Sequence, residues 1–169
     1  LFTTPLKWQL NDQQPIDFTS QFSKQGNDYN IHVSNIDLAM LSSLSPLFIV
    51  KKSVRKKLVD MQLTGNVKDI FIRKQQGELQ VLSHFSQLNS RYSSGIPGVE
   101  NVSGKLSYIN QYLALDFSAE QGELDFNELF VAAFPYQKIS AEVSANFNDN
   151  HRSLAVNDLV LSSEVINIS

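Results

Sequence analysis

The sequence predicts a mainly β protein of the α+β class, in which one antiparallel sheet is interrupted by two short helices. Apolar and polar residues alternate with a period of two through most of residues 1–36 and 61–169, which is typical of strands with one buried face. In residues 37–60 the apolar residues recur at helical spacing instead. We therefore expect residues 1–169 to form a single slab: antiparallel strands in 1–36, two short helices in 37–60 and antiparallel strand pairs in 61–169.

Two strands of the first zone are marked by apolar residues at every second position. The turn residues Gly26, Asn27 and Asp28 separate them. Because this turn is short, the two strands are predicted to be antiparallel neighbours. The apolar positions are Ile16, Phe18 and Phe22 before the turn, and Tyr29, Ile31 and Val33 after it.

The helical zone is predicted to hold two helices. Asp37 is the expected N-cap of the first, which ends near Pro46 and has Leu38, Leu41 and Leu44 at helical spacing. Ser53 is the expected N-cap of the second. On that helix most basic residues lie opposite the apolar side, which is formed by Val54, Leu58 and Met61.

The strands of the third zone begin and bend at recognisable signals. In the run 96–104, Pro97 fixes its own φ and Gly98 tolerates a positive φ, which suits a tight turn, so the run is predicted to start a β-hairpin. Near the C-terminus the alternation changes phase, because Leu159 and Leu161 fall on the opposite parity from the apolar residues before them. This slip predicts a β-bulge at Asn157-Asp158.

Three segments of the third zone share one order of residue types: apolar, hydroxyl, small, polar, apolar. They begin at Leu63, Val102 and Ile139, at intervals of 39 and 37 residues. If the match is more than chance, the repeating unit is a pair of long strands. Since the chain begins at Leu1 and its last strand pattern runs to Ser169, we expect a fragment of a larger repetitive β structure.

Composition excludes several classes of function. The net charge of −3 argues against general nucleic-acid binding. The chain has no cysteine, and neither end carries an apolar run long enough to cross a membrane. Five of the 14 basic residues nevertheless fall within seven positions, so the positive charge is local: Lys51, Lys52, Arg55, Lys56 and Lys57.

No motif carries chemistry. The three histidines are far apart in sequence and have no second ligand at i+2 or i+4, so we expect no metal site. Four acids lie around one predicted hairpin but lack the spacing of a calcium loop, so they are interpreted as part of a solvent-exposed strand face: Asp116, Glu120, Glu123 and Asp125. No serine stands in a nucleophile motif and no glycine-rich loop precedes a helix. We therefore predict a protein that is not an enzyme and holds no cofactor.

Several runs of the chain resemble the central domain of the YhdP family, within the AsmA-like superfamily of bacterial envelope proteins. The likeness covers residues 30–169. Its most distinctive part is Pro97-Gly98-Val99-Glu100-Asn101-Val102-Ser103-Gly104. The remaining matches are Leu41, Leu44 and Pro46, Gly65 to Ile70, Leu113 to Phe117, Gly122 to Asp125, and Leu129-Phe130.

The resemblance implies a strongly curved antiparallel sheet that forms an open groove with an apolar concave face. It implies a periplasmic segment of a protein anchored in the inner membrane of a Gram-negative bacterium. Such proteins are linked to phospholipid transport between the inner and outer membranes. The implied partners are phospholipid acyl chains, neighbouring segments of the same chain and a membrane surface, without nucleic acid.

Two alternatives follow for the residues that alternate along the strands. Either they line a groove for acyl chains, or they form the core of a closed sandwich or barrel in a structural module. The candidate lipid-facing residues are Leu106, Tyr108, Leu113, Leu115, Phe117, Ile139, Val143 and Phe147. The basic run at 51–57 is likewise either a site for lipid phosphates or a membrane surface, or a solvated helix face.

Overall fold

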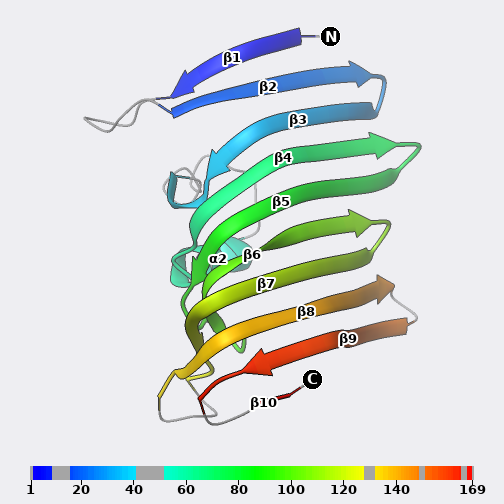
Figure 1. Cartoon of the computed structure of the whole chain (residues 1–169). Helices are drawn as coiled ribbons and strands as arrows, with labels where there is room; N and C mark the ends of the chain where they lie inside the picture. Colours follow the sequence, from blue (N-terminus) through cyan, green and yellow to red (C-terminus); the bar gives the residue numbers. More distant parts are fainter. Residues whose placement is uncertain are drawn as a thin grey trace.

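The computed structural model describes residues 2–8, 16–40, 52–127, 132–148, 151–164 and 167–168. In this part of the chain ten strands form one antiparallel sheet, in which each strand pairs with its neighbours in the sequence (Figure 1). The strands are β1 (Phe2–Trp8), β2 (Ile16–Gln25), β3 (Asp28–Asp37), β4 (Thr64–Gln75), β5 (Glu78–Ser90), β6 (Gly98–Ile109), β7 (Tyr112–Asp125), β8 (Phe134–Asn148), β9 (His151–Ser162) and β10 (Asn167–Ile168).

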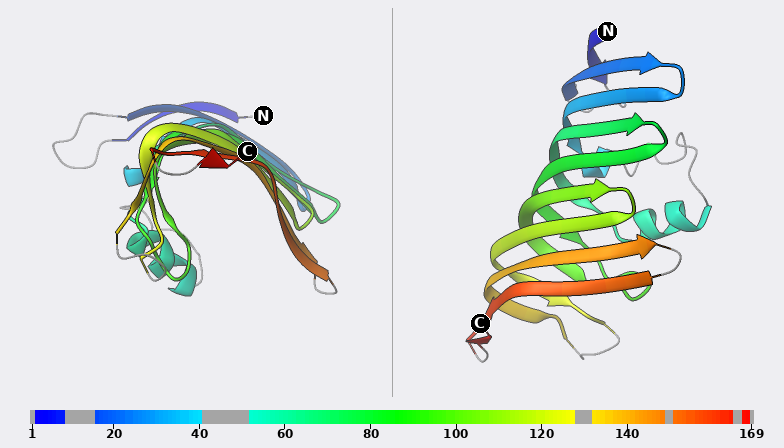
Figure 2. Two further views of the ribbon diagram at one scale, coloured as in Figure 1. Left: turned by 60° about the horizontal axis from the view of Figure 1, so that its bottom comes forward. Right: turned by 90° about the vertical axis from the view of Figure 1, so that its right-hand side faces the viewer.

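The sheet is open and strongly bent. β1 and β10 lie at its two ends and do not pair with each other, so the alternative of a closed sandwich or barrel is wrong. Seen along the stack of strands, the sheet forms an arch with two legs (Figure 2). The prediction of a mainly β fold with a curved, open antiparallel sheet is therefore confirmed.

β-Bulges account for much of the bend. Residues with positive φ interrupt consecutive strands at Gln87, Asn101 and Gln121, and the register shifts beside the first two. Asn101 is held on both sides, since its N–H is donated to Asn89 Oδ1 over 2.8 Å and its Nδ2 to the Glu120 carbonyl over 3.2 Å. Bulges bend a strand and increase its twist, so a line of them folds the sheet into an arch.

The predicted bulge in the last long strand is confirmed. The register of β8 with β9 shifts between Ser140 and Glu142, and Asp158 has a φ of 49°. The extra residue restores the apolar parity, because Val156 opposes Val143 before the bulge and Leu161 opposes Ile139 after it.

The two edges of the arch differ in their connections. The turns after β2, β4 and β6 are two residues long and lie along one edge, where β8 also ends and β9 begins; we call this edge the hairpin rim (Figure 1). β3, β5 and β7 end at the other edge, the connection rim, and more residues separate each of them from the next strand. The three predicted repeat segments lie in β4, β6 and β8, the first strands of successive hairpins, and the repeat itself stays a prediction.

The helical zone leaves the sheet at the connection rim. Asp37 caps the first helix as predicted, since its Oδ1 accepts the N–H groups of Ala39 and Met40; residues 41–51 lie outside the described part. The helix α2 (Lys52–Asp60) begins one residue before Ser53, so the prediction that Ser53 caps it is wrong. α2 lies at the concave side of the arch (Figure 2), where Arg91 donates its N–H to the Met61 carbonyl over 2.8 Å.

Gly98 is needed for a different reason from the one predicted. Its φ is not positive. A Cβ at this position would instead lie 2.8 Å from the Tyr92 nitrogen and 2.9 Å from the Ser90 carbonyl oxygen. Close approach of the backbone therefore excludes a side chain where β6 begins.

Candidate functional site

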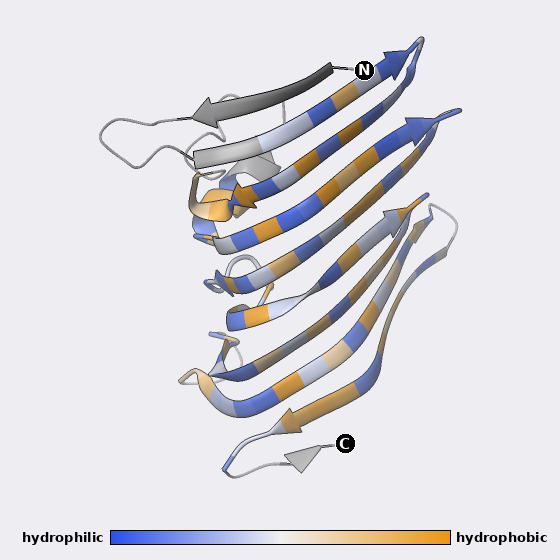
Figure 3. Cartoon of the chain, turned by 45° about the horizontal axis from the view of Figure 1, so that its top comes forward, coloured by the Kyte–Doolittle hydropathy of each residue, from blue (hydrophilic) through white to orange (hydrophobic). Residues whose placement is uncertain are grey.

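The strand register aligns apolar side chains into rows that cross the sheet. The alternation along each strand is visible as bands of opposite hydropathy (Figure 3). Two of these rows, which we call the open rows, run beside the hairpin rim. The first contains Phe22, Ile31, Ile72, Val81, Tyr108, Leu113, Ala145 and Leu154. The second contains Ser83, Leu106, Leu115, Val143 and Val156.

The apolar rows lie on the concave side of the arch. Side chains on the inside of a bend converge and bury one another, whereas those on the outside diverge. The buried residues of the sheet share the face of the open rows, while the neighbouring positions Lys105, Asp116 and Glu142 on the opposite face are exposed. The apolar face therefore points inward and the charged face outward.

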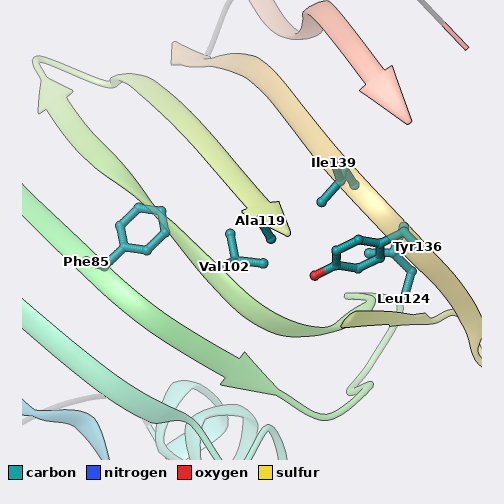
Figure 4. Packing of buried hydrophobic residues seen from close by; sticks show 6 residues of the cluster. All are labelled: Phe85, Val102, Ala119, Leu124, Tyr136 and Ile139. Carbon is teal, nitrogen blue, oxygen red and sulfur yellow. The ribbon is translucent and has the colours of Figure 1, made fainter. Parts of the chain in front are cut away.

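Toward the connection rim the concave side is filled by its own side chains. Six buried residues pack together there, and we call this cluster the closed half (Figure 4). They come from four consecutive strands, β5 to β8, so the bend brings them into contact. The closed half consists of Phe85, Val102, Ala119, Leu124, Tyr136 and Ile139.

Two aromatic rings in the closed half lie against glycines. A Cβ on Gly104 would come within 2.8 Å of the Phe85 ring and 2.1 Å of the Asp116 carbonyl oxygen. A Cβ on Gly122 would meet the Tyr136 ring at 2.8 Å. Each ring therefore occupies the space that a side chain on the neighbouring strand would need, and covers the bare backbone.

Tyr136 also carries the polar anchor of the closed half. Its hydroxyl donates a hydrogen bond to the Glu100 carbonyl, across the bulge of β6. Burial raises the pKa of this phenol above its usual 10.0, and the charge of Glu100 raises it further. The neutral, hydrogen-bonded form of Tyr136 is thus the one that the fold favours.

The open rows keep much of their apolar surface accessible. Leu154 is 72% exposed and Val156 50%, while Ile139 in the closed half is 5% exposed. Leu113, Leu115 and most other central members are half-buried, while Ala145 is buried at 7% exposure. Large, continuous apolar surfaces are rarely left exposed on a protein unless they bind a partner or ligand. The open rows are therefore a candidate binding face.

The eight candidate lipid-facing residues all lie on the concave face, and the structure divides them. Five belong to the open rows: Leu106, Tyr108, Leu113, Leu115 and Val143. Phe117 packs against the closed half, and Ile139 is part of it. Phe147 lies near the hairpin rim and is 51% exposed.

Sequence reasoning missed half of the open rows. Phe22, Ile31, Ile72 and Val81 extend the first row across β2 to β5, and Leu154 and Val156 extend both rows onto β9. Their alternation with polar neighbours is the same signal that marked the residues of β6 to β8. What the sequence lacked was the register that joins them.

The basic run is not part of the open rows. Lys51 lies outside the described residues, and Lys52 and Arg55 belong to α2 but their side chains are not described. Lys56 and Lys57 are exposed on α2, which lies at the connection rim. The structure therefore separates the described part of the run from the exposed apolar surface.

The convex face carries exposed charged side chains such as Lys105, Asp116 and Glu142. His84 Nδ1 lies 3.8 Å from Asp69 Oδ2, beside a shallow depression of about 470 Å³ that Leu82, Lys105 and Asp116 also line. Within the described ranges, no three histidine or acidic side chains are grouped so as to hold a metal ion. The same part of the chain contains no helix with the length and apolarity required to span a bilayer.

Comparison with known families decides the relationship of the chain. The model of the YhdP protein family matches residues 3–169. The chain belongs to the YhdP family. The resemblance seen in residues 30–169 is thereby confirmed and extends to the N-terminal strands. No curated protein and no solved structure matches the chain significantly.

Family membership indicates the general setting of the protein. The YhdP family is a family of bacterial envelope proteins, and membership suggests a role related to lipid transport. The family is not known as an enzymatic one. The open arch with its apolar concave side is the feature of this chain on which such a role can rest.

Proposed function

We propose that this segment of a YhdP-family protein shields phospholipid acyl chains on the open rows of its concave face. In this proposal it lies in the periplasm, belongs to a protein anchored in the inner membrane, and conducts lipid between the inner and outer membranes without catalysing a reaction. The observation that carries the proposal is the partly exposed apolar surface that crosses β2 to β9.

The energetics favour an acyl chain as the occupant. Burying one methylene group contributes about 0.8 kcal/mol, so a chain of many methylenes is held without a specific polar contact. The rows cross the strands and neighbouring strands lie about 4.8 Å apart, so eight strands offer a path roughly 34 Å long. An acyl chain can therefore shift along the rows without losing contact, as conduction requires.

A photocrosslinking experiment tests the proposal. A photoreactive residue at Leu113, in the first open row, should capture phospholipid in intact cell envelopes. The matched control is Ser118, which is exposed on the convex side of the same strand. Capture of protein alone at Leu113, or equal lipid capture at Ser118, would favour the lipid-free structural module instead.

A further inference from the structure

One row beyond the open rows, at the hairpin rim, two lysines lie on the concave face beside Tyr29 and Leu79. Lys24 opposes Tyr29 on β3, and Tyr29 opposes Lys74 on β4. Each lies two positions along its strand from a member of the first open row, namely Phe22, Ile31 and Ile72. Because side chains two apart share a face, the two ammonium groups border the concave apolar surface.

The positive charge of the two lysines is not neutralised within the described residues. No ion pair joins Lys24 or Lys74 to an acid in that part of the chain. The acids of the same rim, Asp28 and Glu78, occupy the alternate positions that point to the convex side, and Asp28 accepts the Gln76 N–H over 2.9 Å. The charge of the lysines is thus available to a ligand on the concave face.

We propose that Lys24 and Lys74 bind the phosphate of a glycerophospholipid whose acyl chains lie on the open rows between β2 and β5. The inference rests on the proposed function and adds the orientation of the lipid. The apolar row and the cationic pair repeat the order of a phospholipid, with hydrocarbon first and phosphate at its end. Lysine suits this place, because its long stem packs on apolar surface while its ammonium group stays at the rim.

The orientation also fits the two rims. At the connection-rim side of β5 to β8 the closed half fills the concave face with its own side chains, so a head group has no space beside these strands. The turns after β2 and β4 on the hairpin rim are two residues long and exposed, so they add little cover to this edge of the concave side. A charged head group at the hairpin rim stays hydrated while the acyl chains are shielded.

The test compares two lipids with identical acyl chains, phosphatidylglycerol and diacylglycerol, of which only the first carries a phosphate. A photoreactive residue replaces Val81, which opposes Ile72 in the first open row. The variant K24Q/K74Q removes the cationic pair. The matched control K68Q/K105Q removes two exposed lysines from the convex face, with the same change in net charge.

We expect K24Q/K74Q to lower the capture of phosphatidylglycerol about 25-fold, or roughly fivefold for each lysine, because a lysine near anionic lipid contributes about 1 kcal/mol. Capture of diacylglycerol should not change, and K68Q/K105Q should change neither. Unchanged capture of phosphatidylglycerol in K24Q/K74Q, or an equal loss of both lipids, would overturn the inference and leave the proposed function standing.

Two further outcomes separate the sources of failure. If the protein with both lysines intact captures neither lipid through the photoreactive residue at Val81, the proposed function fails together with the inference. Inorganic phosphate at millimolar concentration should not displace phosphatidylglycerol, because it lacks the acyl chains that provide most of the binding. Displacement by inorganic phosphate would mean that the pair binds the free anion, and would also overturn the inference.

Discussion

The closed half and the open rows share one face of one sheet, yet they bury their apolar residues differently. In the closed half the strands are bulged, and the side chains of four strands cover one another. In the open rows the strands stay paired up to the hairpin rim, and comparable residues such as Leu154 remain exposed. The same alternation thus yields a core or a binding surface, depending on local curvature.

Truncation in the two regions should give the largest contrast. Ile139→Ala, in the closed half, should lower the free energy of unfolding by about 2–5 kcal/mol, because it leaves a cavity among buried neighbours. Leu154→Ala, in the first open row, should change it by less than roughly 0.5 kcal/mol, because that side chain is 72% exposed. Urea unfolding of both variants measures the difference, and equal losses would show that the open rows are also a closed core.

Filling the space beneath an aromatic ring should be the next largest effect. Gly104→Ala should lower the free energy of unfolding by about 1–3 kcal/mol, because its methyl group meets both the Phe85 ring and the Asp116 carbonyl. Gly77→Ala, at a hairpin turn, meets no atom within 4 Å and should cost only about 1 kcal/mol, through its positive φ. A larger loss at Gly77 would contradict this account of the closed half.

Alkaline pH should weaken the closed half specifically. The pKa of Tyr136 is raised in the folded protein, so the neutral phenol contributes stability that is fully present below about pH 10. This stability is lost as the pH rises through the folded pKa. In Tyr136→Phe, which loses the hydrogen bond to Glu100 and about 1 kcal/mol, unfolding between pH 9 and 11 should depend less on pH. An unaltered pH dependence in the variant would exclude Tyr136 as the responsible group.

A charge on the open rows should have the smallest effect on stability while removing the proposed activity. Leu154→Asp should change the free energy of unfolding by less than roughly 0.5 kcal/mol, because the side chain already contacts water. It should nevertheless reduce lipid capture by a photoreactive residue at Leu113 in the same open row, because placing a carboxylate among apolar acyl chains costs free energy. Undiminished capture would mean that lipid does not reach β9.

The local elements were predictable because their signals are local. Alternation in β2, β3 and β8, the turn at Gly26 and the cap at Asp37 depend only on near neighbours in the chain. The phase slip that predicted the bulge at Asp158 is of the same kind. Gly98 was misinterpreted because its neighbours, Tyr92 and Ser90, belong to the preceding strand and its loop.

The candidate site was predictable only in part. The alternation of apolar and polar residues placed all eight candidate residues on one face of the sheet, and the observed strand register agrees with this placement. It could not show that Ile139 is sealed in the closed half while Leu113 is not, because both have the same pattern around them. Nor could it show that Lys24 and Lys74 lie on either side of Tyr29 in one row, since they are 50 positions apart in the sequence.

The sequence by itself determined the strands, their sequential pairing, the absence of a recognisable catalytic motif, and membership of the YhdP family. These properties follow from residue periodicity, short turns and a distinctive run at 97–104. Only the tertiary structure decided which half of the apolar face is filled and which stays accessible. Curvature is the reason, because it depends on bulges in neighbouring strands acting together and not on any single strand.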